Sequence, residues 1–163
     1  MDNLNLSASE VLAWNHESAT RWQHFLTAHP DLLQLPCDIA GAKNLAELLR
    51  HIVVVELRNT ERLSGRPLTN TGDIPCTLDA MFAVHRKAHE AYSRLLADAA
   101  FDWSRVFEFE SLAGKRWRPT AKKMFFHANL HSIRHYTQLH ALVRENGFKT
   151  GWLGDLIDTD TMA

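Results

Sequence analysis

The chain has 163 residues, of which 45% are hydrophobic and 23% are charged, and its formal net charge at pH 7 is −1. These values are typical of one globular domain, and they offer no basic surface for nucleic acid or for a membrane. No apolar run approaches the ~18 residues that span a bilayer, and residues 1–10 do not resemble a secretory signal. We therefore expect a cytoplasmic protein that binds neither nucleic acid nor membrane.

The first predicted helix covers residues 7–29. Ser7 and Glu10 have the spacing of a capping box, in which each side chain bonds the backbone amide of the other residue. Apolar side chains recur behind them at helical period, which predicts one buried face. His16 and His24 point away from that face, so we expect both to be solvated.

The second predicted helix covers residues 44–63 and follows a connection over residues 30–43. Its buried face contains Glu56, which is an unexpected position for a carboxylate, and His51 lies at the edge of the same face. Residues 64–76 are rich in Gly, Pro, Thr and Asn, which predicts a long loop. Short loops make neighbouring helices antiparallel, whereas a loop of this length permits a crossover.

The third predicted helix covers residues 77–99 and carries His85 and His89 on its apolar face. Residues 105–118 then change to an alternating pattern, with acidic residues before a turn and basic residues after it. This pattern predicts a small β-hairpin whose two arms carry complementary charges. The hairpin directly precedes the last helix and could cover one end of a helical bundle.

The last predicted helix, residues 120–147, contains His127, His131 and His135 at intervals of four. At ~100° per residue, each step of four drifts by only ~40°, so adjacent pairs share one face. A histidine pair at this spacing can chelate one divalent ion. Spacing alone does not decide whether His127 or His135 is the partner of His131, and other segments must complete the site.

The same helix has a second apolar face, formed by Phe125, Phe126, Ile133, Tyr136 and Val143. Such a face is explained either by contact with two neighbouring helices or by a homodimer interface, and both explanations stay open. Four amphipathic helices with almost no strand predict an all-α fold. We expect a four-helix bundle with a long crossover between the second and third helices and a small β-hairpin before the fourth.

Three stretches of this sequence match a known pattern: His51 within LLRHIVV, residues 62–65 at the end of the second helix, and the block HSIRHYTQLHALVRENG. Together they resemble the DinB-like superfamily along nearly the whole chain. The usual family wording His-Arg-Gly-Gln is here His135-Tyr-Thr-Gln138, a departure that leaves the histidine in place. The resemblance implies a single domain over residues 1–163 with an up-down-down-up path of its helices.

The resemblance also implies a divalent metal ion held by His51, His131 and His135. Nitrogen ligands suit Zn or Ni best, with Fe or Mn as further candidates. Members with assigned activities are metal-dependent thiol transferases, maleylpyruvate isomerase-like enzymes and related proteins. The implied function is therefore an enzyme acting on a small molecule, as a transferase or hydrolase, with a low-molecular-weight thiol as a candidate partner. The alternative is a non-catalytic, metal-stabilised binding or interaction protein of the stress response.

Other polar side chains compete for roles around this site. Gln138, Glu56 and His127 are candidates for the outer groups that fix the tautomers of the ligating imidazoles. His85 and His89 either face the same interior, as further ligands or a proton relay, or are core histidines. A basic cluster either is solvated or attracts an anionic substrate. Its members are Lys115, Arg116, Arg118, Lys122 and Lys123.

Overall fold

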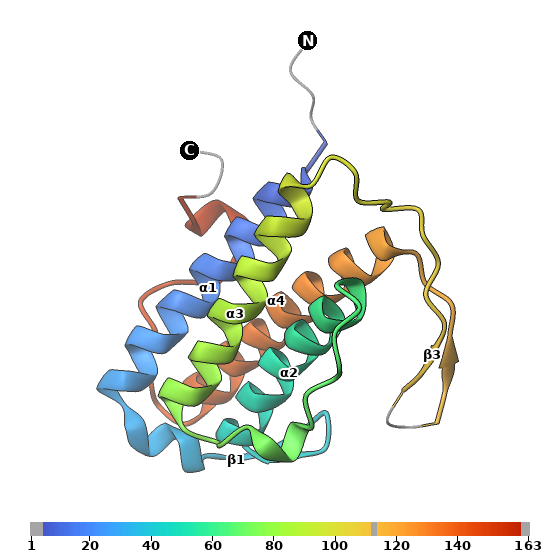
Figure 1. Cartoon of the computed structure of the whole chain (residues 1–163). Coiled ribbons are helices and arrows are strands. Elements are labelled where there is room, and N and C mark those ends of the chain that lie inside the picture. The colour runs from blue at the N-terminus through green and yellow to red at the C-terminus, as the bar shows by residue number, and fades with distance from the viewer. Residues whose placement is uncertain (1–4, 112–113, 161–163) are drawn as a thin grey trace.

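The computed structural model describes residues 5–111 and 114–160. Four long helices form a bundle (Figure 1), which confirms the predicted all-α fold. α1 and α2 each pack against both α3 and α4. α1 therefore lies diagonally opposite α2 in the bundle, and α3 lies diagonally opposite α4. The four helices are α1 Ala8–Ala28, α2 Leu45–Leu63, α3 Leu78–Ala97 and α4 Ala121–Glu145.

The predicted crossover lies between α2 and α3. The connecting loop runs back along the bundle, so α2 and α3 point in the same direction (Figure 1). It contains a short 3-10 helix, η2 Thr71–Asp73, and it is anchored on α2 by the buried Glu61. The carboxylate of Glu61 accepts hydrogen bonds from the Thr69 backbone N–H at 2.9 Å and from the Thr69 hydroxyl at 2.5 Å.

The first two long helices begin at the capping residues that the sequence predicts, Ser7 and Asn44. The hydroxyl of Ser7 accepts a hydrogen bond from the Glu10 N–H at 3.1 Å, and the Glu10 carboxylate accepts one from the Ser7 N–H at 2.6 Å. The Asn44 side chain accepts from the Glu47 N–H at 2.9 Å. Caps of this kind stabilise a helix by ~1 kcal/mol each, which fixes where α1 and α2 begin.

Two small hairpins flank the bundle. The predicted one is present as β3 Phe109–Glu110 paired with β4 Arg116–Trp117. A second one was not predicted: after η1 Pro30–Gln34, β1 Pro36–Ile39 pairs with β2 Ala42–Asn44. Its turn has positive φ at Ala40 and Gly41, as a tight two-residue hairpin turn requires.

The second apolar face of α4 is covered within the chain. Phe125, Tyr136 and Val143 are each at most 2% exposed, and Ile133 is 8% exposed. Contacts with neighbouring helices therefore account for this face, and the homodimer stays a prediction. Within the described residues, no helix is both long enough and apolar enough to cross a membrane.

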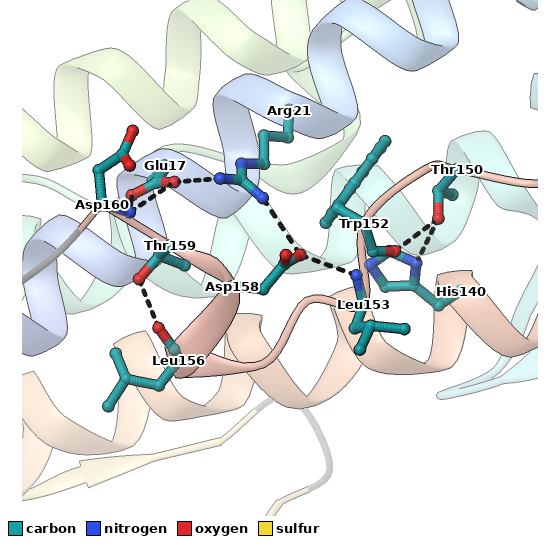
Figure 2. A network of polar contacts seen from close by, with 10 residues as sticks. All are labelled: Glu17, Arg21, His140, Thr150, Trp152, Leu153, Leu156, Asp158, Thr159 and Asp160. Atoms are coloured by element: carbon teal, nitrogen blue, oxygen red, sulfur yellow. Dashed lines mark hydrogen bonds and ion pairs between the residues drawn. The ribbon is translucent and has the colours of Figure 1, made fainter.

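A C-terminal strap, residues 146–160, runs back over α1 and α4 (Figure 2). The Trp152 ring lies 5.5 Å from that of Trp22, centroid to centroid, and Asp158 in η3 Leu156–Asp158 forms an ion pair with Arg21 at 3.3 Å. Gly154 has φ +81, and a Cβ there would lie 2.7 Å from His140 Nε2. A side chain at this position would therefore strain the backbone and displace the His140 ring.

Candidate metal centre

Histidines from two helices converge at one point. His51 is on α2, and His131 and His135 are one turn apart on α4. The Nε2 atom of His131 lies 3.1 Å from Nε2 of His51 and 3.1 Å from Nε2 of His135. Two imidazole nitrogens bound to one tetrahedral zinc ion at ~2.0–2.1 Å would be ~3.3 Å apart. The spacing of the three nitrogens therefore suits a single transition-metal ion.

Gln138 fixes the orientation of one of the three rings. Its side-chain oxygen lies 2.6 Å from His135 Nδ1, one helical turn along α4. Because an amide oxygen only accepts hydrogen bonds, Nδ1 carries the hydrogen and Nε2 directs its lone pair to the centre. Of the three candidate outer groups, Gln138 makes this contact. The guanidinium of the exposed Arg134 also donates to His135 Nε2 at 3.3 Å, where a bound ion would displace it.

The three imidazoles are neutral at physiological pH. Burial and then the neighbouring His135 and His51 lower the pKa of His131 to about 3. Burial lowers the pKa of His135 to about 4, although its hydrogen bond with Gln138 opposes the shift. Burial and then Arg134 lower the pKa of His51. Metal ligation requires the neutral ring, so the lone pairs are free at pH 7 without loss of a proton.

Glu56 is the centre of a separate polar network and not an outer group of the metal centre. It is 1% exposed, and it accepts hydrogen bonds from His85 Nδ1 at 2.8 Å, Asn15 Nδ2 at 2.7 Å and Ser132 Oγ at 2.7 Å. The four residues come from α2, α3, α1 and α4. Each helix of the bundle thus contributes one side chain to a buried hydrogen-bonded cluster.

The network keeps Glu56 ionised. Burial alone would raise the pKa of Glu56, but the charge of His85 and the hydrogen bonds from His85, Asn15 and Ser132 outweigh burial, so the pKa is lowered. The carboxylate accepts from His85 Nδ1, so that atom carries a hydrogen. A buried charge with several donors is stable only while those donors stay in place.

His16 extends this network, so the prediction that it is solvated is wrong. Its Nδ1 lies 3.1 Å from His85 Nε2, and its ring stacks on that of His89 with 4.1 Å between centroids. Burial and then His16 and His85 lower the pKa of His89 to about 4. α1 packs against α3 as well as α4, so its contact surface is wider than the apolar face that the sequence reveals. These contacts place His85 and His89 with Glu56 and His16. They do not support the interpretation that His85 and His89 are further ligands of the metal centre.

A cavity of about 590 Å³ opens beside His51. It lies between α2, the first turns of α4, the β1–β2 turn and the β3–β4 hairpin, and His127 is part of its wall. Much of the wall is apolar. The apolar side chains are Ala40, Ala42, Val54, Val55, Phe109, Trp117, Pro119 and Met124. His51 belongs both to the cavity wall and to the histidine cluster, whereas His131 and His135 are not among the lining residues, so the cavity adjoins the candidate metal centre through His51.

Only Lys123 of the predicted basic cluster lines the cavity. Arg118 pairs with Glu108 at 2.7 Å across the exposed base of the hairpin, and the Lys115 ammonium lies 4.3 Å from the centroid of the Trp117 ring. The hairpin therefore uses part of its basic charge in its own contacts.

Comparison with known families gives a match over most of the chain. The model of the DinB superfamily matches residues 17–139, which include the three converging histidines. The chain belongs to the DinB superfamily. DinB-like proteins are metal-binding, in agreement with the cluster formed by His51, His131 and His135. In this DinB protein the C-terminal strap lies beyond the matched region. A search of curated proteins found no match.

Proposed function

We propose that this DinB-superfamily protein is a metal-dependent enzyme that acts on a small molecule, as a transferase or a hydrolase. The observation that carries the proposal is the convergence of three neutral imidazoles at the edge of a cavity, with His131 Nε2 3.1 Å from Nε2 of His51 and 3.1 Å from Nε2 of His135. We further propose His51, His131 and His135 as the metal ligands, with Zn or Ni as the ion best suited to nitrogen ligands.

Three protein ligands are typical of a catalytic rather than a structural zinc site, because they leave positions for water or substrate. When bound, such an ion lowers the pKa of a coordinated water or thiol and polarises a carbonyl group. Of the chain's own residues, His51 connects the ligand set to the cavity, and Gln138 holds His135 in the ligating tautomer.

The cavity wall contributes the second requirement of an enzyme, which is a place to bind and orient a substrate. Its volume suits a molecule of metabolite size, and its apolar side chains give the body of such a molecule a surface to pack against. Cys37 and Cys76 do not line it, so a thiol in the reaction would come from a low-molecular-weight co-substrate. The alternative, a non-catalytic metal-stabilised binding protein, would use the same cavity without turnover.

Metal analysis of the purified protein tests the ligand set. We expect about one zinc or nickel ion per chain in the unsubstituted protein, and loss of most of it in His51→Ala, His131→Ala and His135→Ala. His24→Ala is the matched control, since His24 is exposed on α1 and far from the cluster in sequence. A full equivalent of metal in His131→Ala would overturn the proposed ligand set.

Turnover distinguishes the enzyme from the binding protein. The metal-loaded protein is mixed with low-molecular-weight thiols and electrophilic acceptors, and with activated esters and amides, and products are followed by mass spectrometry. Turnover that disappears in His131→Ala supports a transferase or hydrolase. A metal-loaded protein that turns over none of these mixtures, but unfolds when the ion is chelated, supports the alternative.

A further inference from the structure

The cavity beside His51 has an excess of positive charge. Four cationic side chains line it, namely Arg50, Arg58, Arg62 and Lys123, and Glu47 is the only carboxylate among its lining residues. The chain as a whole carries a formal net charge of −1. Positive charge is therefore concentrated in this cavity and does not reflect the overall composition.

The arginines form a row along α2. Arg50, Arg58 and Arg62 are separated by multiples of four residues, which places them on one side of the helix together with Val54. All three are half-buried. A row of half-buried guanidinium groups is unusual without anionic partners, because burial removes part of their hydration.

No carboxylate of the described residues forms an ion pair with these arginines. Arg58 donates to the backbone carbonyl of Thr69 at 3.3 Å, and Arg62 donates to that of Arg58 at 3.4 Å. A guanidinium has five N–H donors, so most of those on Arg58 and Arg62 have no protein acceptor in these contacts. Glu61, the nearest acidic residue in sequence, is bonded to Thr69 instead.

Arg62 is held in place by an aromatic contact. Its guanidinium carbon lies 4.2 Å from the centroid of the Phe109 ring in the β3–β4 hairpin. Burial and then the charge of Arg58 lower the pKa of Arg62, although the charge of Glu61 opposes the shift. The two guanidinium groups therefore repel each other, and an anion bound between them would relieve that repulsion.

We infer that the cavity binds a small amphiphilic acid, whose apolar body contacts Val55, Met124 and Trp117 and whose acidic group is bound by Arg58 and Arg62. The binding of the acid itself does not depend on the proposed function. Only the further expectation, that the end of the ligand opposite the acidic group reaches the metal centre, rests on it. Arg58 and Arg62 follow His51 by seven and eleven residues. At 1.5 Å per residue, the acidic group lies ~10–16 Å along α2 from that histidine.

A pair of fluorescent dyes tests the acid preference. Anilinonaphthalene sulfonate carries an acidic group, whereas N-phenylnaphthylamine has the same aromatic body without it. Both are titrated into metal-free protein, whose native fold is checked by near-ultraviolet circular dichroism. We expect one sulfonate dye per chain, bound at least tenfold more tightly than the neutral dye, because charged hydrogen bonds contribute that much or more.

Substitution of the arginines links the preference to the cavity. Arg58→Gln and Arg62→Gln are expected to weaken binding of the sulfonate dye about tenfold and to leave the neutral dye unchanged. Arg58→Lys should restore part of the loss, since it keeps the charge. Arg86→Gln is the matched control, because Arg86 is exposed on α3 and outside the cavity. Equal affinity for both dyes, or unchanged sulfonate binding in both glutamine variants, would refute the inference.

A second series tests the position of the acid relative to the metal. Monohydroxamates of dicarboxylic acids, of increasing chain length, are titrated into zinc-loaded protein, with alkyl hydroxamates of equal length as controls. We expect the acid to improve affinity only in the longer members, and Arg58→Gln to abolish the improvement. A result in which all lengths gain equally would place the acid elsewhere. Because the dye experiment uses metal-free protein, its outcome does not depend on the proposed metal site.

Discussion

The bundle contains two histidine clusters that differ in what surrounds them. In one, His85 contacts the buried carboxylate of Glu56, which accepts three hydrogen bonds from the protein, and His16 contacts His85. His131 and His135 have the same spacing on a helix as His85 and His89, yet no carboxylate is among their hydrogen-bond partners, and their nitrogens face that of His51. The cluster of His85 and His16 therefore contains a carboxylate of the chain, whereas the cluster of His51, His131 and His135 contains none.

The difference arises from α2, which contributes to both clusters. His51 and Glu56 are five residues apart, so their side chains point ~140° apart around the helix axis. His51 faces α4 and the cavity, whereas Glu56 faces the centre of the bundle. A histidine pair on a helix is therefore not a metal site in itself. The role of such a pair depends on the residue that the neighbouring helix places opposite it. A carboxylate there favours a structural pair, and a third histidine favours a metal-binding pair.

Removal of the buried anion should have the largest effect. Glu56→Ala removes the acceptor of the buried His85 Nδ1–H and of one Asn15 Nδ2–H, whereas the Ser132 hydroxyl keeps the Ala128 carbonyl at 3.1 Å. We expect the loss to cost ~3–5 kcal/mol of the free energy of unfolding. Urea denaturation measures the loss. Glu90→Ala is the control, since that carboxylate is exposed and should cost less than ~0.5 kcal/mol. Equal stability of the two variants would show that the network does not stabilise the bundle.

The second-largest expected effect is loss of stability of the metal-free protein in acid. The pKa values of about 3 for His131 and about 4 for His135 lie below that of an unfolded histidine, ~6.5, so the unfolded chain binds more protons below that pH. Stability is then lost as pH falls from ~6.5 toward 4. The lowered pKa of Glu56 adds a loss below ~4.5. Urea denaturation at a series of pH values in chelator measures this, and a His131→Ala/His135→Ala double variant should show a shallower dependence above pH 4.5.

Metal should stabilise only through the cluster that lacks a carboxylate. At a zinc concentration 100 times the dissociation constant, binding contributes ~2.7 kcal/mol, which corresponds to ~5–10 °C in Tm for a chain of this length. Differential scanning fluorimetry with zinc and with chelator measures the shift. His131→Ala should abolish it. His89→Ala, in the other cluster, should retain the shift whatever its own Tm, and loss of the shift there would contradict the assignment.

Loss of the outer hydrogen bond should have a smaller effect on the metal centre. Gln138→Leu removes the acceptor of His135 Nδ1–H, and we expect zinc affinity to fall about tenfold. Competition with a chromophoric chelator measures it. Thr137→Ala is the neighbouring control, because the Thr137 hydroxyl bonds only the backbone of Ile133 at 3.1 Å. Unchanged affinity in Gln138→Leu would mean that the packing of His135 alone fixes its ring.

The smallest expected effect on the metal centre comes from the C-terminal strap, which lies outside both clusters. Gly154→Ala meets a positive φ and a contact of 2.7 Å with His140 Nε2, which together should cost ~1–3 kcal/mol. Gly151→Ala meets a positive φ of +84 but no atom within 4 Å, so it should cost less. Urea denaturation compares the two, and zinc affinity should be unchanged in both.

The sequence was sufficient for the helices and insufficient for the polar contacts between them. Capping at Ser7 and Asn44 and the period of the apolar residues locate the helices, because both signals are local. The partner of His131 was not decided by spacing, and the choice of His51 and His135 came from the resemblance to a family. That choice agrees with the geometry.

Three features could not be read from the sequence. The strands β1 and β2 are too short to show alternation. His16 belongs to a face of α1 that becomes buried only because α3 packs there. The arginines of α2 resemble a solvated helix face until two hairpins and a loop enclose them. In the last two cases a segment distant in sequence supplies the missing surface, so no local pattern records it.

The enclosure of the cavity by two hairpins has a consequence for how this protein could diversify. The proposed metal ligands are on the long helices α2 and α4, whereas part of the wall that a substrate would meet, including Ala40, Phe109 and Trp117, is on the β1–β2 turn and the β3–β4 hairpin. Exchange or lengthening of those hairpins would alter substrate choice while the reactive centre kept its geometry. Libraries that randomise the hairpins alone are therefore the economical route to new specificities on this scaffold.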